Sequence, residues 1–199
     1  YNGTTYGNGW TERISSRALE IRACNEALRV EHDPANTEPY ESFGYCDLNI
    51  SAYVAAGQTF LNLVRGNLYN SHFQFRVNCD NATLVNIGAN GAFGYSPGLG
   101  TLPGLGSTNS GNMHVESQGS VTVTGTGYCH FKGTLSFLNT NWLDNMGVDA
   151  NGISRFSCDN YVYSGYNRNI SAGIARFTSP RLNPASFLKS DAESMGLYQ

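Results

Sequence analysis

Alternation of apolar and polar residues is the feature that most constrains how this chain can fold. In residues 72–79 every second side chain is apolar, namely Phe73, Phe75, Val77 and Cys79. Residues 120–124 and 129–138 follow the same period of two. Such a period places one side of a strand in a core and the other in water, as is typical of antiparallel sheets. It therefore predicts half-buried strands in all three segments.

Shorter apolar runs add candidate strands, separated by turns rich in Gly, Asn and Asp. They lie at residues 48–54, 59–64, 83–88, 113–118, 153–158, 161–163 and 170–177. A succession of short strands with such turns indicates a β-sandwich or a jelly-roll. We therefore predict a mainly β protein, an antiparallel β-sandwich or jelly-roll-like domain.

The N-terminal region carries the one pattern with a helical period. Residues 12–47 hold 12 of the 27 charged side chains (12 basic and 15 acidic), whereas residues 81–131 hold only Glu116. After Thr11, a candidate N-cap, apolar residues recur at steps of three and four, at Ile14, Ala18, Ile21, Cys24 and Leu28. This spacing predicts one amphipathic α-helix over about residues 12–30. It would pack on the domain's own sheet or, alternatively, against a neighbouring subunit.

Two uncharged segments predict contacts with other subunits. Residues 1–11 form an extended N-terminal arm ahead of a single β-rich domain, residues 12–199. Residues 88–112 form a glycine-rich loop with eight glycines and a repeated Pro-Gly-Leu-Gly, and long loops of this kind are usually functional or disordered. The alternatives are a frayed terminus and a loop folded over its own domain. The candidate assembly contacts are Tyr1, Tyr6, Trp10, Phe93, Tyr95, Leu99, Leu102 and Leu105.

The cysteines leave two interpretations open. They stand at Cys24, Cys46, Cys79, Cys129 and Cys158, and no two of them have the C-x-x-C spacing of a zinc ribbon or a thioredoxin-type site. In an oxidising compartment they could form two disulfides and leave one thiol over. In a reducing compartment they would be small buried hydrophobic residues. The four N-x-Ser/Thr sequons match the number expected by chance, so they do not indicate glycosylation.

Composition argues against several classes of partner. The 12 Lys and Arg are scattered and the formal net charge is −3, whereas a nucleic-acid surface needs clustered cations. No apolar run approaches the ~18 residues of a membrane span. The chain also has no Walker loop, G-x-S-x-G or H-E-x-x-H motif, so we predict no cofactor and no enzymatic activity.

One cluster could hold a divalent metal. His114 and Glu116 would share a strand face, with His130 close by if residues 113–118 and 128–138 pair. An exposed polar strand face supplies the same residue types without a metal. The only carboxylates in residues 81–190 are Glu116, Asp144, Asp149 and Asp159, which offers little to a glycoside hydrolase.

Low charge, an aromatic arm and an apolar loop suit large interfaces whose core is depleted in charge. We therefore predict a structural or assembly subunit of a virion or of an extracellular filament, in contact with copies of itself or with other structural subunits. Tyr1 is neither an initiator Met nor a small residue left by its removal, so we expect proteolytic processing or a shortened chain. The alternative is a secreted carbohydrate-binding or adhesin-type β-sandwich, with a small hydrolase as a third hypothesis. The expected location is the virion or the extracellular surface.

Overall fold

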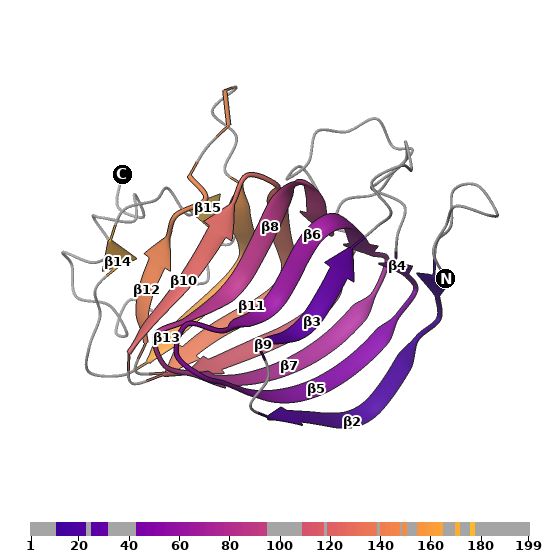
Figure 1. Ribbon diagram of the computed structural model, residues 1–199, viewed down its shortest axis with the longest axis horizontal. Helices are drawn as coiled ribbons and strands as arrows, with labels where there is room; N and C mark the ends of the chain where they lie inside the picture. The colour runs from indigo at the N-terminus through magenta and orange to yellow at the C-terminus, as the bar shows by residue number, and fades with distance from the viewer. Residues whose placement is uncertain are drawn as a thin grey trace.

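The computed structural model of the chain shows parallel strands stacked one above another (Figure 1). It describes residues 11–22, 25–31, 43–94, 109–117, 119–138, 140–147, 149–150, 155–164, 170–171 and 176–177. Every regular element in these residues is a β-strand, and every strand pair is parallel. The described part of the chain is therefore a β-solenoid, in which the chain winds in coils and each coil pairs with the next.

The strands follow one another closely along the chain. They are β1 (Thr11–Glu12), β2 (Ser15–Arg22), β3 (Glu26–Glu31), β4 (Phe43–Gly44), β5 (Asp47–Val54), β6 (Thr59–Tyr69), β7 (His72–Cys79), β8 (Ala82–Phe93), β9 (Ser110–Glu116), β10 (Ser120–Gly125), β11 (Tyr128–Leu138), β12 (Asn141–Asp144), β13 (Phe156–Ser164), β14 (Ile170–Ser171) and β15 (Arg176–Phe177).

The coils present three faces, because each coil turns corners between strands instead of reversing. Face A contains β2, β5, β7, β9 and the C-terminal parts of β11 and β13. Face B contains β3, β10, β12, β14 and most of β6 and β8. Face C is made by β1, β4, the ends of β6 and β8, the starts of β11 and β13, and β15. Figure 1 shows β2 and β3 at one end of the stack and β12 and β14 at the other.

The core lies inside the coils and is filled by the inward members of each alternating strand. On β7, Phe73, Phe75 and Val77 are buried while the residues between them are exposed. Phe73 contacts the rings of Phe93 and Phe131, on face C, at centroid distances of 5.2 and 5.4 Å. The predictions of strands at residues 72–79, 120–124 and 129–138 are therefore confirmed, and the apolar side chains predicted to face inward are buried; His130, predicted on a polar side, is buried too.

The corner from face C to face A repeats in successive coils. Arg13, Tyr45 and Asn70 occupy it in the first three coils, with φ values of 60°, 54° and 47°. Beside them, backbone hydrogen bonds link one coil to the next, from Asp47 N–H to the Ile14 carbonyl and from His72 N–H to the Cys46 carbonyl. A residue in the left-handed backbone region turns the chain sharply without reversing it. The same conformation thus marks the start of face A in each of these three coils.

The antiparallel sandwich predicted from sequence is wrong. Asn70 and Ser71 join β6 to β7, but the two strands lie on different faces, and β7 pairs instead with β5. A short turn containing Asn or Gly has the same composition whether the chain reverses in a hairpin or turns a corner of a coil. Asp47 pairs with His72, 25 residues later, and a pairing between residues so far apart has no local signal.

The N-terminal helix is also wrong. Within residues 12–30, the described parts form β2 and β3, on faces A and B. The predicted apolar stripe does not exist, because Ile14 and Ala18 are exposed and Leu28 lies on the other strand. Each segment pairs along one of its edges, β2 with β5 and β3 with β6, and this tertiary effect overrides local helix propensity.

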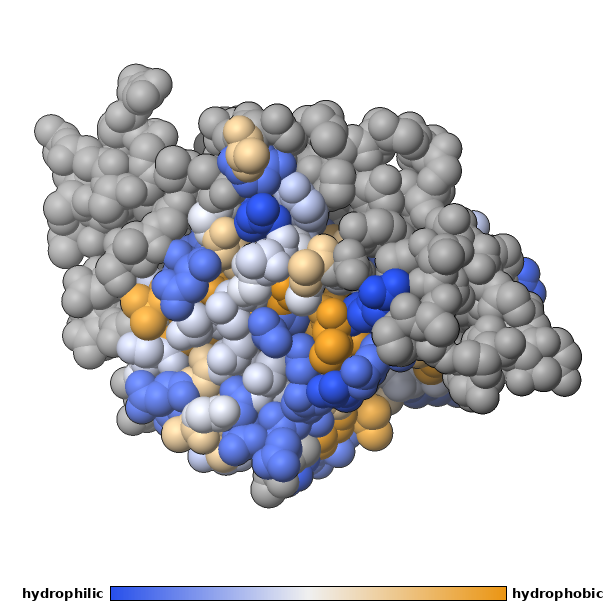
Figure 2. Space-filling view, turned by 45° about the horizontal axis from the view of Figure 1, so that its top comes forward, coloured by the Kyte–Doolittle hydropathy of each residue, from blue (hydrophilic) through white to orange (hydrophobic). Residues whose placement is uncertain are grey.

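The outer surface is mixed in character. On the side that Figure 2 shows, hydrophilic and neutral residues predominate, and hydrophobic ones form separate spots. This is the pattern of a surface in contact with water. Among the described residues, no helix has the length and apolarity needed to cross a membrane.

Candidate functional site

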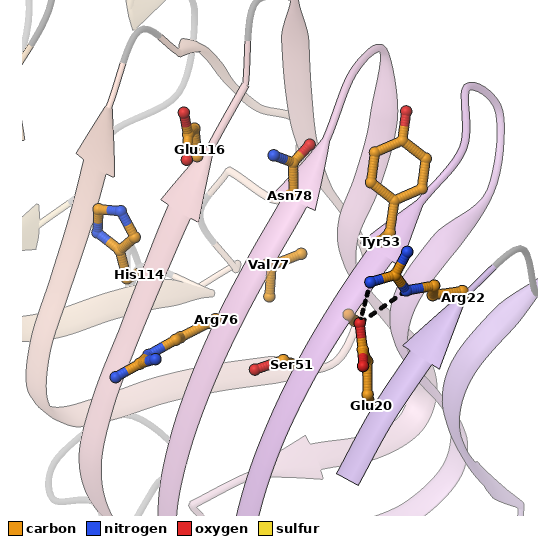
Figure 3. A pocket seen from close by; sticks show the side chains of 10 residues that line it. Glu20, Arg22, Ser51, Tyr53, Arg76, Val77, Asn78, His114 and Glu116 are labelled. Atoms are coloured by element: carbon orange, nitrogen blue, oxygen red, sulfur yellow. Dashed lines mark hydrogen bonds and ion pairs between the residues drawn. The ribbon is translucent and has the colours of Figure 1, made fainter. Parts of the chain in front are cut away.

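An open groove of about 330 Å³ crosses the outer side of face A (Figure 3). Four neighbouring strands, β2, β5, β7 and β9, each contribute side chains to it. The residues that line it are Glu20, Arg22, Ser51, Ala52, Tyr53, Arg76, Val77, Asn78, His114 and Glu116. Most of the residues that line this groove are polar or charged, which makes it the candidate site.

Register places the polar side chains of the groove in two parallel rows. Glu20, Ser51, Arg76 and His114 are successive partners in one row. Two residues further along each strand, Arg22, Tyr53, Asn78 and Glu116 form the second row. Neighbours within a row are about 4.8 Å apart, the spacing of paired strands. The three intervals between the four strands therefore extend over roughly 14 Å.

Four side chains in the groove have no hydrogen-bond or ion-pair partner among the described residues. At one end, Arg22 Nε donates to Glu20 Oε1 at 2.6 Å, so these two charges neutralise each other. The side chains of Tyr53, Arg76, Asn78 and Glu116 make no hydrogen bond or ion pair with the described residues. Figure 3 shows them separated along the face, with the Tyr53 ring projecting from β5. The groove thus offers a guanidinium, an amide, a carboxylate and an aromatic ring to a ligand.

His114 is held in place by the next coil. Its Nδ1 lies 2.9 Å from Ser136 Oγ, and the Ser136 hydroxyl donates in turn to the Met113 carbonyl at 3.4 Å. While the Ser136 hydroxyl donates to the Met113 carbonyl, its oxygen can accept a hydrogen bond only from the tautomer of His114 that carries the hydrogen on Nδ1. Nε2 of the neutral imidazole is then an acceptor. An imidazole fixed in this way presents a defined hydrogen-bonding atom to the groove.

The structure does not bring the predicted metal ligands together. His114 and Glu116 are exposed on face A, whereas His130 is buried on face C, where its partner across the strands is Ser157. Across from β9, β11 contributes Ser136 and Leu138 instead. No group of three or more His, Cys, Asp or Glu suited to a metal occurs in the described part of the chain.

Four of the five cysteines are described, and all four are buried free thiols: Cys46, Cys79, Cys129 and Cys158. Cys24 lies outside the described residues. Burial, with a further effect from the Asp80 carboxylate, raises the pKa of Cys79 to about 12. Burial also raises the pKa of Cys129 well above its usual range, with smaller effects of Cys158 and Asp144. The disulfide interpretation therefore receives no support from these four residues.

Phe93 is the only predicted assembly contact that the structure describes. It is 1% exposed, and its ring lies 4.7 Å from that of Phe131 inside the core, so it cannot contact a partner. Of the predicted loop, residues 88–93 belong to β8 and residues 110–112 to β9, while residues 95–108 lie outside the described part of the chain. The remaining predicted contacts lie outside the described residues, namely Tyr1, Tyr6, Trp10, Tyr95, Leu99, Leu102 and Leu105.

Sequence reasoning singled out His114 and Glu116 but missed Tyr53, Arg76 and Asn78. Alternation in β7 does place Arg76 and Asn78 on the polar side. That they stand beside His114 and Glu116, 38 residues later, depends on the register between β7 and β9. No protein-family model, curated protein or solved structure matched the chain. The chemistry of the groove is accordingly the basis for a function.

Proposed function

We propose that this chain is a carbohydrate-binding module, which holds an extended glycan in the groove on face A. The observation that carries the proposal is a set of side chains on neighbouring strands that have no partner in the described part of the chain, namely Tyr53, Arg76, Asn78 and Glu116. The β-solenoid replaces the β-sandwich as the scaffold of this function. A rigid parallel face keeps such side chains at constant spacing.

The groups in the groove match the chemistry of a sugar. A hydroxyl both donates and accepts, and the groove supplies donors in Arg76, acceptors in Glu116 and both in Asn78. Hydrogen bonds from charged groups to hydroxyls are stronger than neutral ones. Tyr53 is 53% exposed and adds a ring on which the apolar face of a sugar can pack. An open groove that crosses four neighbouring strands suits a chain of sugars better than a compact ligand.

Two other ligand classes fit less well. A nucleic acid needs several free cations, whereas Arg22 is paired with Glu20 and Glu116 adds a negative charge. Glycoside hydrolysis needs two carboxyl groups about 5–9.5 Å apart. Glu20 and Glu116 stand on β2 and β9, with β5 and β7 between them, roughly 14 Å from strand to strand. This spacing favours binding without cleavage.

A glycan array tests the proposal directly. The full chain, fluorescently labelled, is applied to immobilised neutral and acidic oligosaccharides, and the strongest positive is then titrated in solution. We expect Tyr53→Ala and Arg76→Ala each to weaken binding by about tenfold, a loss of ~1.4 kcal/mol. Absence of any glycan above background, or binding that neither substitution weakens, would overturn the proposal.

Matched controls separate the groove from general surface effects. Tyr45, 56% exposed, is as accessible as Tyr53 but lies outside the groove. Lys132 is likewise an exposed cation, on β11, that does not line the groove. Tyr45→Ala and Lys132→Ala should leave glycan binding within about twofold of the unmodified protein. Circular dichroism of all four variants checks that the fold is retained.

The structural-subunit hypothesis, with a virion or extracellular location, remains a prediction that the groove does not test. It concerns contacts between chains. The end of the solenoid, rather than face A, is where such contacts would form.

A further inference from the structure

The N-terminal end of the solenoid presents three strand edges without a strand partner among the described residues. Within the part of the chain that is described, β1 pairs only with β4, β2 only with β5, and β3 only with β6. These three strands form the first coil, so their free edges lie at the same end of the stack. An unpaired edge is a ready template for another strand, and β2 offers eight residues of it.

An apolar cavity of about 180 Å³ opens at the same end, where a further coil would otherwise fill the interior. Its wall includes the core residues Val30, Ile50 and Leu61. At its margin, Ile14 is 40% and Leu19 45% exposed, although both are large hydrophobic residues. A terminal coil of a solenoid normally needs a polar cap to be soluble. This end has an apolar interior bordered by exposed apolar side chains.

The charges around this end are balanced, with both signs side by side. β2 and β3 together carry three Arg and three Glu: Arg17, Glu20, Arg22, Glu26, Arg29 and Glu31. Arg22 already pairs with Glu20, and Arg29 with Glu26 and Glu31. When a surface meets its own copy, a patch of one sign repels, whereas a balanced patch can set each Arg against a Glu. The end therefore carries no excess of one sign that would repel a second copy.

We propose that the N-terminal end is a contact surface for a second copy of this chain, with two solenoids meeting end to end about a two-fold axis. The two-fold relation runs β2 antiparallel to β2 of the partner and closes both apolar cavities together. The opposite end suits this edge less well, because its free edges among the described residues are residues 160–164 of β13 and the two-residue strands β14 and β15. They are too short to pair along the eight residues of β2.

Sedimentation velocity of the full chain, from low micromolar to submillimolar concentration, tests the proposal. We expect a monomer–dimer equilibrium, and we expect Leu19→Lys to raise the dissociation constant by about tenfold or more, because Leu19 lies at the rim of the contact. Ala89→Lys places the same charge on an exposed position of β8 and should leave the dissociation constant unchanged. A monomer at all concentrations, or a dimer insensitive to Leu19→Lys, would overturn the proposal.

A mixing experiment identifies the two-fold contact itself. One variant, Arg17→Glu with Arg22→Glu, makes the end acidic; the other, Glu20→Arg with Glu31→Arg, makes it basic. Each alone should dimerise less than the unmodified chain, since like charges then face each other. An equimolar mixture should form the heterodimer. If both variants dimerise as well alone as when mixed, the two ends do not meet and the proposal fails.

Discussion

Gly133 lies directly beside Gly111 on neighbouring parallel strands, and a Cβ built on Gly133 would approach the Gly111 carbonyl oxygen to 1.8 Å. Gly111 meets the carbonyl oxygen of Phe73 in the same way, also at 1.8 Å. Both glycines have positive φ, 143° and 144°, which L side chains rarely adopt. A column of close backbone contacts thus runs through three coils, and only glycine fits at two of its three positions.

We expect Gly133→Ala to lower the free energy of unfolding by about 2–4 kcal/mol, because backbone strain and a clash with fixed backbone add together. Gly57→Ala is the control. Gly57 also has positive φ, 76°, but its Cβ would meet nothing within 4 Å, so it should lose only about 1–2 kcal/mol. Urea denaturation followed by fluorescence measures both. Equal losses in the two variants would show that the close contact does not contribute.

Just before β9, the side chain of Asn109 makes the hydrogen bonds to the preceding coil that backbone groups make elsewhere along the strands. It is fully buried, its Oδ1 accepts from Ser71 N–H at 3.0 Å and its Nδ2 donates to the Leu68 carbonyl at 2.8 Å. Asn109→Ala leaves both backbone groups buried and without that partner, so we expect a loss of about 2–4 kcal/mol. Asn112→Ala, on the exposed side of β9, should change stability by no more than about 0.5 kcal/mol. Similar unfolding curves for the two variants would contradict this role of Asn109.

Asp144 makes stability depend on pH. Burial raises the pKa of this carboxyl, opposed in part by hydrogen bonds from the Met146 and Gly147 backbone. The folded chain then binds the proton more tightly than the unfolded chain. Stability is therefore lost as the pH rises from about 3.9, the ordinary value for Asp, through the raised pKa.

Asp144→Asn removes this ionisation and keeps an oxygen for the Met146 N–H, so we expect a higher Tm than that of the unmodified protein at neutral pH. The difference should shrink as the pH falls, because the carboxyl becomes neutral in both states. Glu116→Gln, the same kind of substitution at an exposed carboxyl, is measured beside it as the control. A Tm difference that does not change with pH would assign the effect to packing instead.

The buried cysteines predict a thiol titration. In Cys24→Ser, the remaining thiols are Cys46, Cys79, Cys129 and Cys158, all buried, and the pKa of Cys79 is about 12. A buried thiol with a raised pKa has almost no thiolate and reacts slowly. We expect no fast reaction with a disulfide reagent at mild alkaline pH, and four thiols after denaturation without reductant. Fewer than four would reveal disulfides, and fast reaction in the native state would contradict the burial.

Alternation in the sequence determined where the main strands lie and which of their side chains face the core. Residues 72–79 form β7 with the predicted side buried, because a period of two is a local property of extended backbone. The same local pattern placed Arg76 and Asn78 on the outside. The alternation does not show that His114 and Glu116 lie beside them, because that depends on the register between β7 and β9.

Only the tertiary structure decided that the strands are parallel, that Asp47 pairs with His72, and that residues 15–22 and 26–31 are strands instead of one helix. Pairing uses backbone N–H and C=O groups, which are the same in every residue, so the partner of a strand leaves little trace in its composition. At the N-terminal end, the side chains repeat with a helical period, but residues 15–22 and 26–31 pair with β5 and β6 and are strands. The groove on face A exists for the same reason, since coiling brings its two rows together from four separate strands.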